Sequence, residues 1–454
     1  MKRTLPWIFI LSGSIFLHFA ANAQEGKEKK VAKTPTGFSF GGLPTISFDA
    51  DMGFQYGGLV SVYDYGDGTI YPSYKQMMKI EISRYTKGSG TNQLFYDAKN
   101  LLPHHLRLTA DLSYLTEKSL DFYGFNGYQS RYNPDFTDKE SADYISRVFY
   151  RDLRKMFRFT VDLQGQISGE HLRWIGGIGI MNIKTGRVDF GAINKGKSGS
   201  DILPDTTNTL FDDYVAWGII SDAEKDGGSA NFVKAGIVYD TRDNEANPMK
   251  GMWSEALITY APKFLFNPEF SYAKLVLIHR QYFTILKDRL SFVYRVGYQG
   301  TIGGTAPFFM QPYMLSSYSS ITKTDGLGGA KTLRGIMRDR VVGDGIVYGN
   351  LELRWKFLKT HVGKQNLYFA LNGFSDFGMV VQQIQIDRTN VNFTSADQAK
   401  YFDFSFEKDK LHPSLGAGLR IALNENFILA IDYGFAMNKQ DGLKGLYINI
   451  GNLF

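Results

Sequence analysis

The sequence contains no cysteine and only 13 prolines in 454 residues. Without cysteine, the chain can form neither a disulfide framework nor a lipoprotein anchor. After the first residues, no apolar run approaches the roughly 18 residues that indicate a membrane-spanning helix. The net charge of +6 is small for this length, and no basic cluster stands beside stacking aromatics. The sequence therefore indicates no nucleic-acid partner.

Residues 1–23 have the features of a secretory signal peptide. The start is positively charged, residues 7–19 are apolar, and a small-x-small cleavage site precedes Gln24. The apolar run is shorter than the roughly 20 residues of a spanning helix. We therefore expect export, with residues 24–43 as a short, charged periplasmic linker.

Aromatic residues make up 15% of the sequence, and 48 residues are glycine. Apolar side chains alternate with other residues over residues 290–298, 414–421 and 427–435. Period two over about eight residues is typical of long, half-buried strands, whereas sandwich strands have about five or six residues. The pattern predicts an all-β fold, a transmembrane antiparallel β-barrel of about 16 strands over residues 44–454.

Two connections between predicted strands, residues 184–231 and 302–345, exceed the others in length. We expect the long loops to be extracellular and the tight turns periplasmic. The second connection places Arg334 in a glycine-flanked loop. In the strand that follows, Asn350, Glu352 and Arg354 alternate with apolar residues. This pattern indicates a loop that carries a cation and leads into a strand with one polar face.

The sequence ends with GLYINIGNLF, in which apolar residues alternate up to Ile450 and Phe454 is the last residue. We expect a last strand with an aromatic end that closes the barrel against the first strand. This ending also resembles the signal that the outer-membrane assembly machinery reads by strand pairing when it inserts a barrel. That machinery is therefore an expected partner.

Five motifs carry a resemblance to a known family. They are VYDTRDNEANPMKG with Asp240, Arg242 and Asp243, GG-x-x-TLRG with Leu333, Arg334, Gly335 and then Ile336, YGNLELR with Glu352, FSDFG with Phe374, Asp376 and Gly378, and INIGNLF with Ile450 and Phe454. In this order, over residues 232–454, they resemble the barrel domain of the BamA/TamA-type outer-membrane assembly and translocation superfamily. The resemblance implies a sixteen-stranded barrel in the outer membrane of a Gram-negative bacterium. It also implies a weak seam between first and last strands, and a sixth extracellular loop folded into the lumen.

Strand parity places Asp376 and Glu352 on the lumenal face, where a buried guanidinium needs acceptors. The resemblance implies that Asp376 pairs with Arg334, with Glu352 as a second acceptor, which forms a latch between loop and wall. Gly335 permits a tight backbone at the loop tip. Ile336 stands where the family usually has an aromatic residue, so we expect looser packing there. The alternative is that Arg334 only balances acidic residues of the wall.

The family's assembly factors carry periplasmic POTRA domains, and residues 24–43 are too few to fold as one. We therefore expect a stand-alone barrel. The first functional hypothesis is insertion of membrane proteins or lipids through the weak seam. The second is a passive pore or structural barrel that works with another outer-membrane partner. A lipid-modifying enzyme is a third and weaker hypothesis.

No motif identifies a catalytic, cofactor or metal site. The seven histidines show no HExxH spacing, and no G-x-S-x-G element is present. We expect neither an enzyme nor a bound metal or cofactor. The expected partners are outer-membrane lipids and lipopolysaccharide, and a client protein or a periplasmic protein that replaces the POTRA domains in trans.

Overall fold

A computed structural model describes most of the chain. The described residues are 36–49, 53–70, 73–86, 88–99, 103, 106–194, 197–245, 247–267, 269–317, 326–362, 365–387, 392–405, 407–423 and 427–454. The expected signal peptide and the first part of the expected linker lie outside them. Within the described ranges, no helix is long and apolar enough to cross a membrane.

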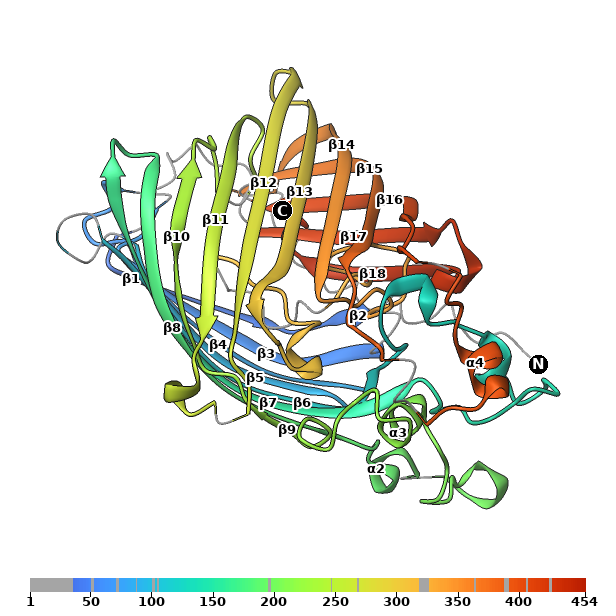
Figure 1. The fold of residues 1–454 in the computed structure, drawn as a ribbon. Coiled ribbons are helices and arrows are strands. Elements are labelled where there is room, and N and C mark those ends of the chain that lie inside the picture. Colours follow the sequence, from blue (N-terminus) through green and yellow to red (C-terminus); the bar gives the residue numbers. More distant parts are fainter. Residues whose placement is uncertain are drawn as a thin grey trace.

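One antiparallel sheet contains all the strands (Figure 1). They are β1 Phe38–Pro44, β2 Ser47–Asp49, β3 Gly53–Asp64, β4 Gln76–Tyr85, β5 Gly90–Ala98, β6 Arg107–Asp121, β7 Arg151–Ser168, β8 Leu172–Gly186, β9 Gly227–Ser229, β10 Phe232–Asp240, β11 Gly251–Ala261, β12 Tyr272–Leu286, β13 Leu290–Gly304, β14 Gly345–Val362, β15 Gln365–Gln382, β16 His412–Leu423, β17 Phe427–Ala436 and β18 Lys444–Ile450. The connections contain the helices α2 Phe190–Asn194, α3 Leu210–Ala216 and α4 Ser395–Tyr401. Short 3-10 helices lie at Gly127–Gln129, Pro134–Thr137, Gly199–Asp201, Lys263–Leu265, Phe308–Met310 and Lys439–Asp441.

The 18 segments form 16 strands around a closed ring. Both β1 and β2 pair with β3, and both β9 and β10 pair with β8, so each of these two pairs is one interrupted strand. The ring closes where β18 pairs with β2. The predicted all-β barrel of about 16 strands is thus confirmed.

The barrel begins earlier than the expected boundary at residue 44. Strand β1 runs along β3 from the pair Phe38↔Asp64 to the pair Pro44↔Gly58. Phe38 and Phe40 are 64% and 75% exposed, as apolar residues on the lipid side of a barrel wall are. In the sequence, the short FSFGG pattern next to a charged tail concealed this strand.

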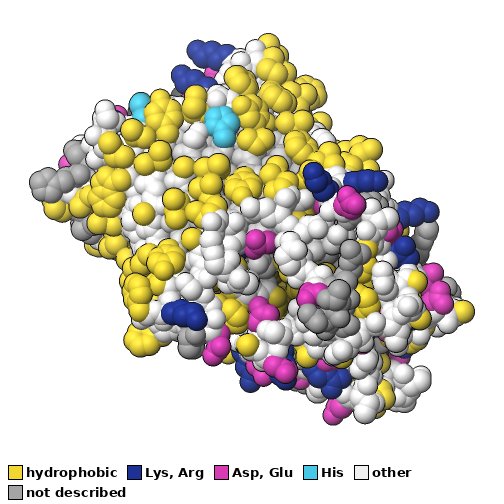
Figure 2. Space-filling model, viewed as in Figure 1, with side chains coloured by type: hydrophobic (Ala, Val, Ile, Leu, Met, Phe, Trp, Pro, Cys, Tyr) yellow, Lys and Arg dark blue, Asp and Glu magenta, His cyan; other side chains and the backbone are white. Residues whose placement is uncertain are grey.

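The two faces of the wall have opposite chemistry. On β14, Asn350, Glu352 and Arg354 are buried, as the predicted parity requires, whereas Leu353 and Trp355 are about half exposed, at 47% and 49%. Figure 2 shows a broad surface of hydrophobic side chains over the upright strands. An apolar outer surface with charges inside is the arrangement that a lipid bilayer favours.

Successive connections alternate between the two ends of the barrel. One end carries the long connections 122–150, 187–226, 305–344 and 383–411, with helices α2, α3 and α4. The other end carries tight turns such as 169–171 and 287–289. The sequence predicted two of the long connections and missed the other two. Connection 305–344 is the sixth at its end, after those that follow β2, β4, β6, β8 and β11, and is called loop 6 below.

The closing contact is far shorter than those between other neighbouring strands. In the described residues, the register of β18 with β2 consists of the single pair Ile448↔Phe48. The register of β14 with β15 runs from Gly345↔Gln382 to Val362↔Gln365. Among the described residues, one register pair is therefore all that joins β18 to β2.

Hydrogen exchange tests this difference. We expect the amides of β18 to exchange at least about tenfold faster than those in the middle of β14 and β15, because local opening is easiest where ladder bonds are few. Exchange of the purified barrel, read by mass spectrometry of peptides, measures both regions at once. Equal protection of β18 and β14 would contradict a weak seam.

Candidate functional site

The tip of loop 6 lies folded against the inner wall of the barrel. Leu327, Leu333, Ile336 and Val341 are fully buried and pack with residues of β14 and β15. The Thr332 hydroxyl accepts a hydrogen bond from the Gly328 amide at 2.8 Å, which tightens the turn. The loop therefore brings its own apolar cluster into the lumen.

Arg334 is held at this tip by carboxylates from two strands. Its Nε and Nη2 donate to the two oxygens of Asp376 on β15, each at 2.9 Å. Its Nη1 lies 2.8 Å from Glu352 Oε1 on β14. Arg334 and Asp376 are fully buried and Glu352 nearly so. The planar fork of arginine suits this bidentate pairing. These three residues are called the latch.

Further contacts fix the guanidinium in place. Its Cζ lies 3.6 Å from the centre of the Phe374 ring, a cation–π contact. Its own backbone amide donates to Asp376 Oδ2 at 3.0 Å. Asp432 of β17 lies 3.5 Å from Nη1 and forms a separate bidentate pair with Arg420. Three carboxylates, those of Asp376, Glu352 and Asp432, thus surround the guanidinium of Arg334.

Two glycines let the loop backbone touch the barrel backbone. Gly335 has φ +94°, and a Cβ there would lie 2.6 Å from the amide nitrogen of Phe435 on β17. A Cβ at Gly434 would lie 2.7 Å from the carbonyl carbon of Arg334. The Gly335 amide also donates to the hydroxyl of Tyr447 on β18, at 3.3 Å. Only glycine at both positions allows this approach.

The comparisons with known proteins concern the barrel as a whole. The model of the Omp85 superfamily domain matches residues 76–454. The chain belongs to the Omp85 superfamily. Barrels of this family lie in the bacterial outer membrane and are not enzymes, and both statements hold for this chain. No curated protein matches the sequence.

The chain is also similar to solved structures, and the first of them shares its fold. BamA from Haemophilus ducreyi lacking POTRA domains 1-3 is 13% identical, with 99% of this chain and 80% of that chain covered and a TM-score of 0.50. CdiB from Escherichia coli is 11% identical, with 93% and 64% covered and a TM-score of 0.49. CdiB from Acinetobacter baumannii is 14% identical, with 92% and 60% covered and a TM-score of 0.40.

The structure gives physical reasons for the other motif residues near the latch. A Cβ at Gly378 would lie 2.7 Å from Leu327 Cδ1 and 3.1 Å from Leu333 Cδ1, so the loop needs glycine there. Ile336 is fully buried, and Tyr348 of β14 supplies an aromatic ring to the same cluster. The looser tip that we expected from Ile336 is therefore not observed.

Asp240, Arg242 and Asp243 lie at the tight-turn end of this Omp85 barrel, outside the latch. Arg242 Nε and Nη2 donate to the two oxygens of Asp240 at 2.9 and 2.8 Å, and the guanidinium lies over the Trp253 ring. Asp243 Oδ1 accepts from the Met249 amide at 3.0 Å. This motif therefore shapes the turn after β10, as short polar side chains commonly do.

The carboxyl end differs from the sequence prediction. Strand β18 ends at Ile450, whose partner is Leu429 on β17. Gly451 has φ +88°, and the chain turns away from the strand. Phe454 is buried next to Tyr282 of β12, so it is not part of the closing strand. The role of this ending as an assembly signal stays a prediction.

Sequence reasoning missed several residues that hold loop 6. Asp432 lies on the lumenal side of a strand whose alternation was recognised, so its parity offered a usable signal. Arg338 Nη2 donates to Glu117 Oε1 at 2.7 Å, and Arg340 Nη2 donates to the carbonyl of Ser130 at 2.9 Å. No local pattern predicts the contacts of these two arginines, because their partners are about 200 residues away along the chain.

The long loops form a cap of packed aromatic rings over the lumen. Ring centroids of Phe125 and Tyr214 are 5.4 Å apart, those of Phe125 and Phe308 are 6.4 Å apart, and those of Trp217 and Phe402 are 5.5 Å apart. These residues come from all four long connections. The loop cap therefore lies at the end of the barrel that carries the long connections.

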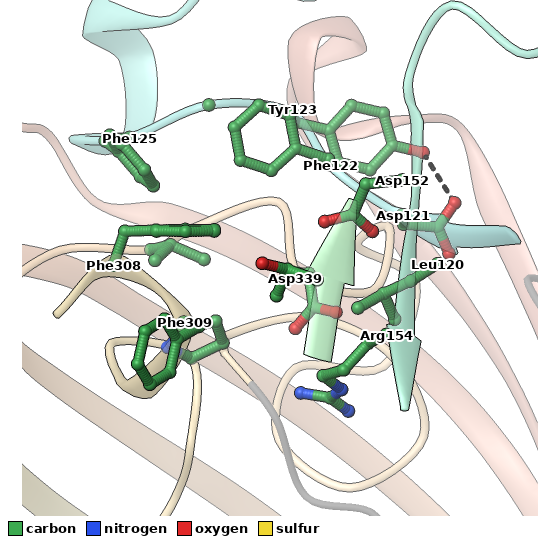
Figure 3. A pocket seen from close by; sticks show the side chains of 14 residues that line it. Leu120, Asp121, Phe122, Tyr123, Phe125, Asp152, Arg154, Phe308, Phe309 and Asp339 are labelled. Carbon is green, nitrogen blue, oxygen red and sulfur yellow. Dashed lines mark hydrogen bonds between the residues drawn. The ribbon is translucent and has the colours of Figure 1, made fainter. Parts of the chain in front are cut away.

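A pocket lies under the loop cap (Figure 3). Aromatic residues, among them Phe122 and Phe308, line one part of it, and Asp152, Arg154 and Asp339 line another. Across the described ranges, no group of three or more His, Cys, Asp or Glu side chains could hold a metal ion. The pocket thus shows no metal-binding arrangement.

Removal of the latch cation tests its contribution to stability. We expect Arg334→Ala to lower the free energy of unfolding by about 3–5 kcal/mol, because Asp376 and Glu352 would lose their buried partner. Urea unfolding in detergent, followed by tryptophan fluorescence, measures this. Arg131→Ala is the control, since the half-exposed Arg131–Asp403 pair should contribute less than about 1 kcal/mol. Similar losses in both variants would contradict the latch.

The loop cap should respond to pH through Asp213 of α3. Burial raises the pKa of Asp213 to about 6, with a further contribution from the carboxylates of Asp212 and Asp397. Because this folded value lies above the ordinary value of 3.8, the ionised carboxylate weakens the cap above about pH 6. The penalty disappears as the pH falls through about 6 toward 4.

We therefore expect the wild-type cap to be cleaved by protease faster than that of Asp213→Asn at about pH 7.5, and the ratio of the two rates to fall toward one as the pH falls to about 4. Taking the ratio of the two proteins at each pH removes the pH dependence of the protease. A ratio that does not change with pH would show that Asp213 does not control the cap.

Proposed function

We propose that this Omp85 barrel inserts membrane clients, protein strands or lipid, through the seam between β2 and β18. The observation that carries the proposal is the single register pair Ile448↔Phe48 at the seam. Every other neighbouring pair of full strands has a longer register in the described residues. The seam is therefore where the ring opens at the lowest cost.

Backbone chemistry makes such an opening useful to a client strand. Unpaired amide and carbonyl groups at a sheet edge form a template for another strand. In lipid, an unpaired backbone group is costly, so an incoming strand gains its partners at this edge. The seven-residue β18 is the template on one side, and β2 with β1 is the template on the other.

The latch supports this proposal because it reinforces the wall beside the seam. Arg334 joins loop 6 to β14 and β15, and Gly335 joins the loop to β17 and β18. Opening at β2 then leaves the strands from β14 to β18 joined through loop 6. The proposal includes outer-membrane lipids and lipopolysaccharide around the wall, and a periplasmic protein that delivers the client.

The alternative is a passive pore or a structural barrel. The aromatic loop cap and the buried tip of loop 6 both occupy the path through the lumen, which argues against steady conduction. Planar-bilayer recordings distinguish the two functions. Steady conductance without any effect on client insertion would favour the pore.

A disulfide across the seam tests insertion directly. We expect Phe48→Cys with Ile448→Cys, once oxidised, to reduce insertion of an unfolded client barrel into liposomes to the rate of empty liposomes. Reduction of the disulfide should restore the wild-type rate. The chain has no cysteine of its own, so only the engineered pair can form.

The matched control is Tyr433→Cys with Leu446→Cys, a register pair between β17 and β18 one strand away. This disulfide should leave insertion unchanged, since it does not bridge the seam. Full activity with the seam locked would refute the proposal. Loss of activity in both disulfide variants would mean that the disulfide itself, and not seam closure, is responsible.

A further inference from the structure

The pocket under the loop cap lies where the cap meets the barrel wall, and we call it the cap pocket. Its lining comes from β6, β7 and β8, from the residues that follow β6, and from loop 6. Its volume is about 30 Å³, which leaves room for about two water-sized groups. The cap pocket can therefore hold a small ligand, but not a chain segment.

Three carboxylates at or beside the cap pocket have guanidinium partners. The pairs are Asp121 with Arg151, Glu117 with Arg154, and Asp339 with Arg338. In each pair the charge of the carboxylate is opposed by a charge of the other sign. The three guanidiniums therefore balance these three carboxylates.

A fourth carboxylate, that of Asp152, has no such partner. Asp152 is 4% exposed and lines the cap pocket from the lumenal side of β7. In the part of the chain that the structure describes, its Oδ1 has no hydrogen-bond partner, and no lysine, arginine or histidine forms an ion pair with it. A buried charge without a partner is costly. The cap pocket therefore lacks one positive charge.

Aromatic rings form much of the remaining lining. Phe122, Phe125 and Phe308 all line the cap pocket. The rings of Phe122 and Phe125 are nearly perpendicular, with centroids 5.7 Å apart. Figure 3 shows Asp152 and Asp339 near its centre, with these three rings around them. The face of an aromatic ring attracts a cation, so rings and carboxylate favour the same charge.

We propose that the cap pocket binds a small alkylammonium ion, with its N–H groups toward Asp152 and its alkyl part against the rings of Phe122 and Phe308. An ammonium group carries one positive charge and only donors, so it supplies both of the things that Asp152 lacks. Calcium and magnesium ions instead need about six oxygen ligands. The proposal goes beyond the insertion function and does not rest on it.

The size of the cap pocket selects the ligand further. Methylammonium has two heavy atoms, which matches the room for about two water-sized groups. A quaternary ammonium with four ethyl groups is too large for this space. Methylammonium is therefore the probe, and tetraethylammonium is a control of equal charge.

A bound ion would join the loop cap to the wall. Asp152 belongs to β7, Phe122 follows β6, and Phe308 belongs to loop 6. An ion among them contacts three parts of the chain that are far apart in sequence. A ligand that binds only the folded cap stabilises it by mass action. We therefore expect methylammonium to raise the unfolding temperature and to slow cleavage of the cap by protease.

The experiment measures thermal unfolding of the wild-type protein in detergent micelles, followed by tryptophan fluorescence at about pH 7.5, where an alkylamine is charged. We expect the midpoint temperature to rise with methylammonium chloride and to reach a plateau as the site fills. Sodium chloride and tetraethylammonium chloride at the same ionic strength should give no such rise. Methanol at the same concentration, which has the size of the probe but no charge, should also give none.

Asp152→Asn keeps the shape of the side chain and removes its charge. We expect this variant to bind methylammonium at least about tenfold more weakly, because a hydrogen bond to a charged group is lost. Without ligand, its midpoint temperature should exceed that of the wild type, because an uncompensated buried charge is gone. A merely structural role of Asp152 would lower that temperature.

Two further variants separate the parts of the cap pocket. Phe122→Leu keeps an apolar side chain but removes the ring face, and should weaken methylammonium binding about two- to fivefold. Asp403→Asn is the matched control, since Asp403 is a partly exposed carboxylate that pairs with Arg131. It should respond to methylammonium as the wild type does.

No rise with methylammonium, or an equal rise with sodium chloride, would overturn the site. An unchanged response in Asp152→Asn would overturn it as well, because binding would then occur elsewhere. The comparison of the salts uses the wild-type protein, so it decides the matter even if Asp152→Asn fails to fold. The seam disulfide measures insertion separately, so the two proposals fail in different experiments.

Discussion

A buried guanidinium needs acceptors, and the position of Arg334 therefore fixes the path of loop 6. Asp376 and Glu352 supply those acceptors from two neighbouring strands. The bidentate geometry sets the orientation of the loop tip, and the glycine contact of Gly335 with β17 can form only in that orientation. The ion pair, the apolar cluster of the tip and the contact of Gly335 with β17 together attach loop 6 to the wall from β14 to β17.

The contact between β18 and β2 differs from this wall in the length of its register. Long antiparallel registers run around the ring, whereas β18 and β2 share a single register pair in the part of the chain that the structure describes. The aromatic rings of the loop cap pack together at the end of the barrel that carries the long connections. The positive φ of Gly451 turns the chain away from the seam, so the closing strand β18 ends at Ile450. The structure thus concentrates its weakness in one place, and the buried charges stabilise the strands beside it.

Much of the fold could be predicted from local pattern, because a barrel wall alternates between lipid and lumen. The alternation through Glu352 and Asp376 gave the correct faces, and the glycine-flanked motif identified Arg334. The features that could not be predicted have no local sequence pattern. Strand β1 is short and glycine-rich, and the aromatic contacts of the loop cap join residues far apart in the chain. Phe454 continued an alternating pattern, yet one glycine with positive φ redirected it.

The central claim is that the barrel opens at the seam while the latched wall stays closed. Spin labels on lipid-facing residues test it most directly in the cysteine-free chain. One pair, Val60 on β3 and Leu415 on β16, spans the seam, and the other, Phe357 on β14 and Phe435 on β17, spans the latched wall. Double electron–electron resonance in liposomes with client should show an added longer distance for the seam pair and one narrow distance for the wall pair. A single unchanged distance for the seam pair, or an added distance for the wall pair, would contradict the account.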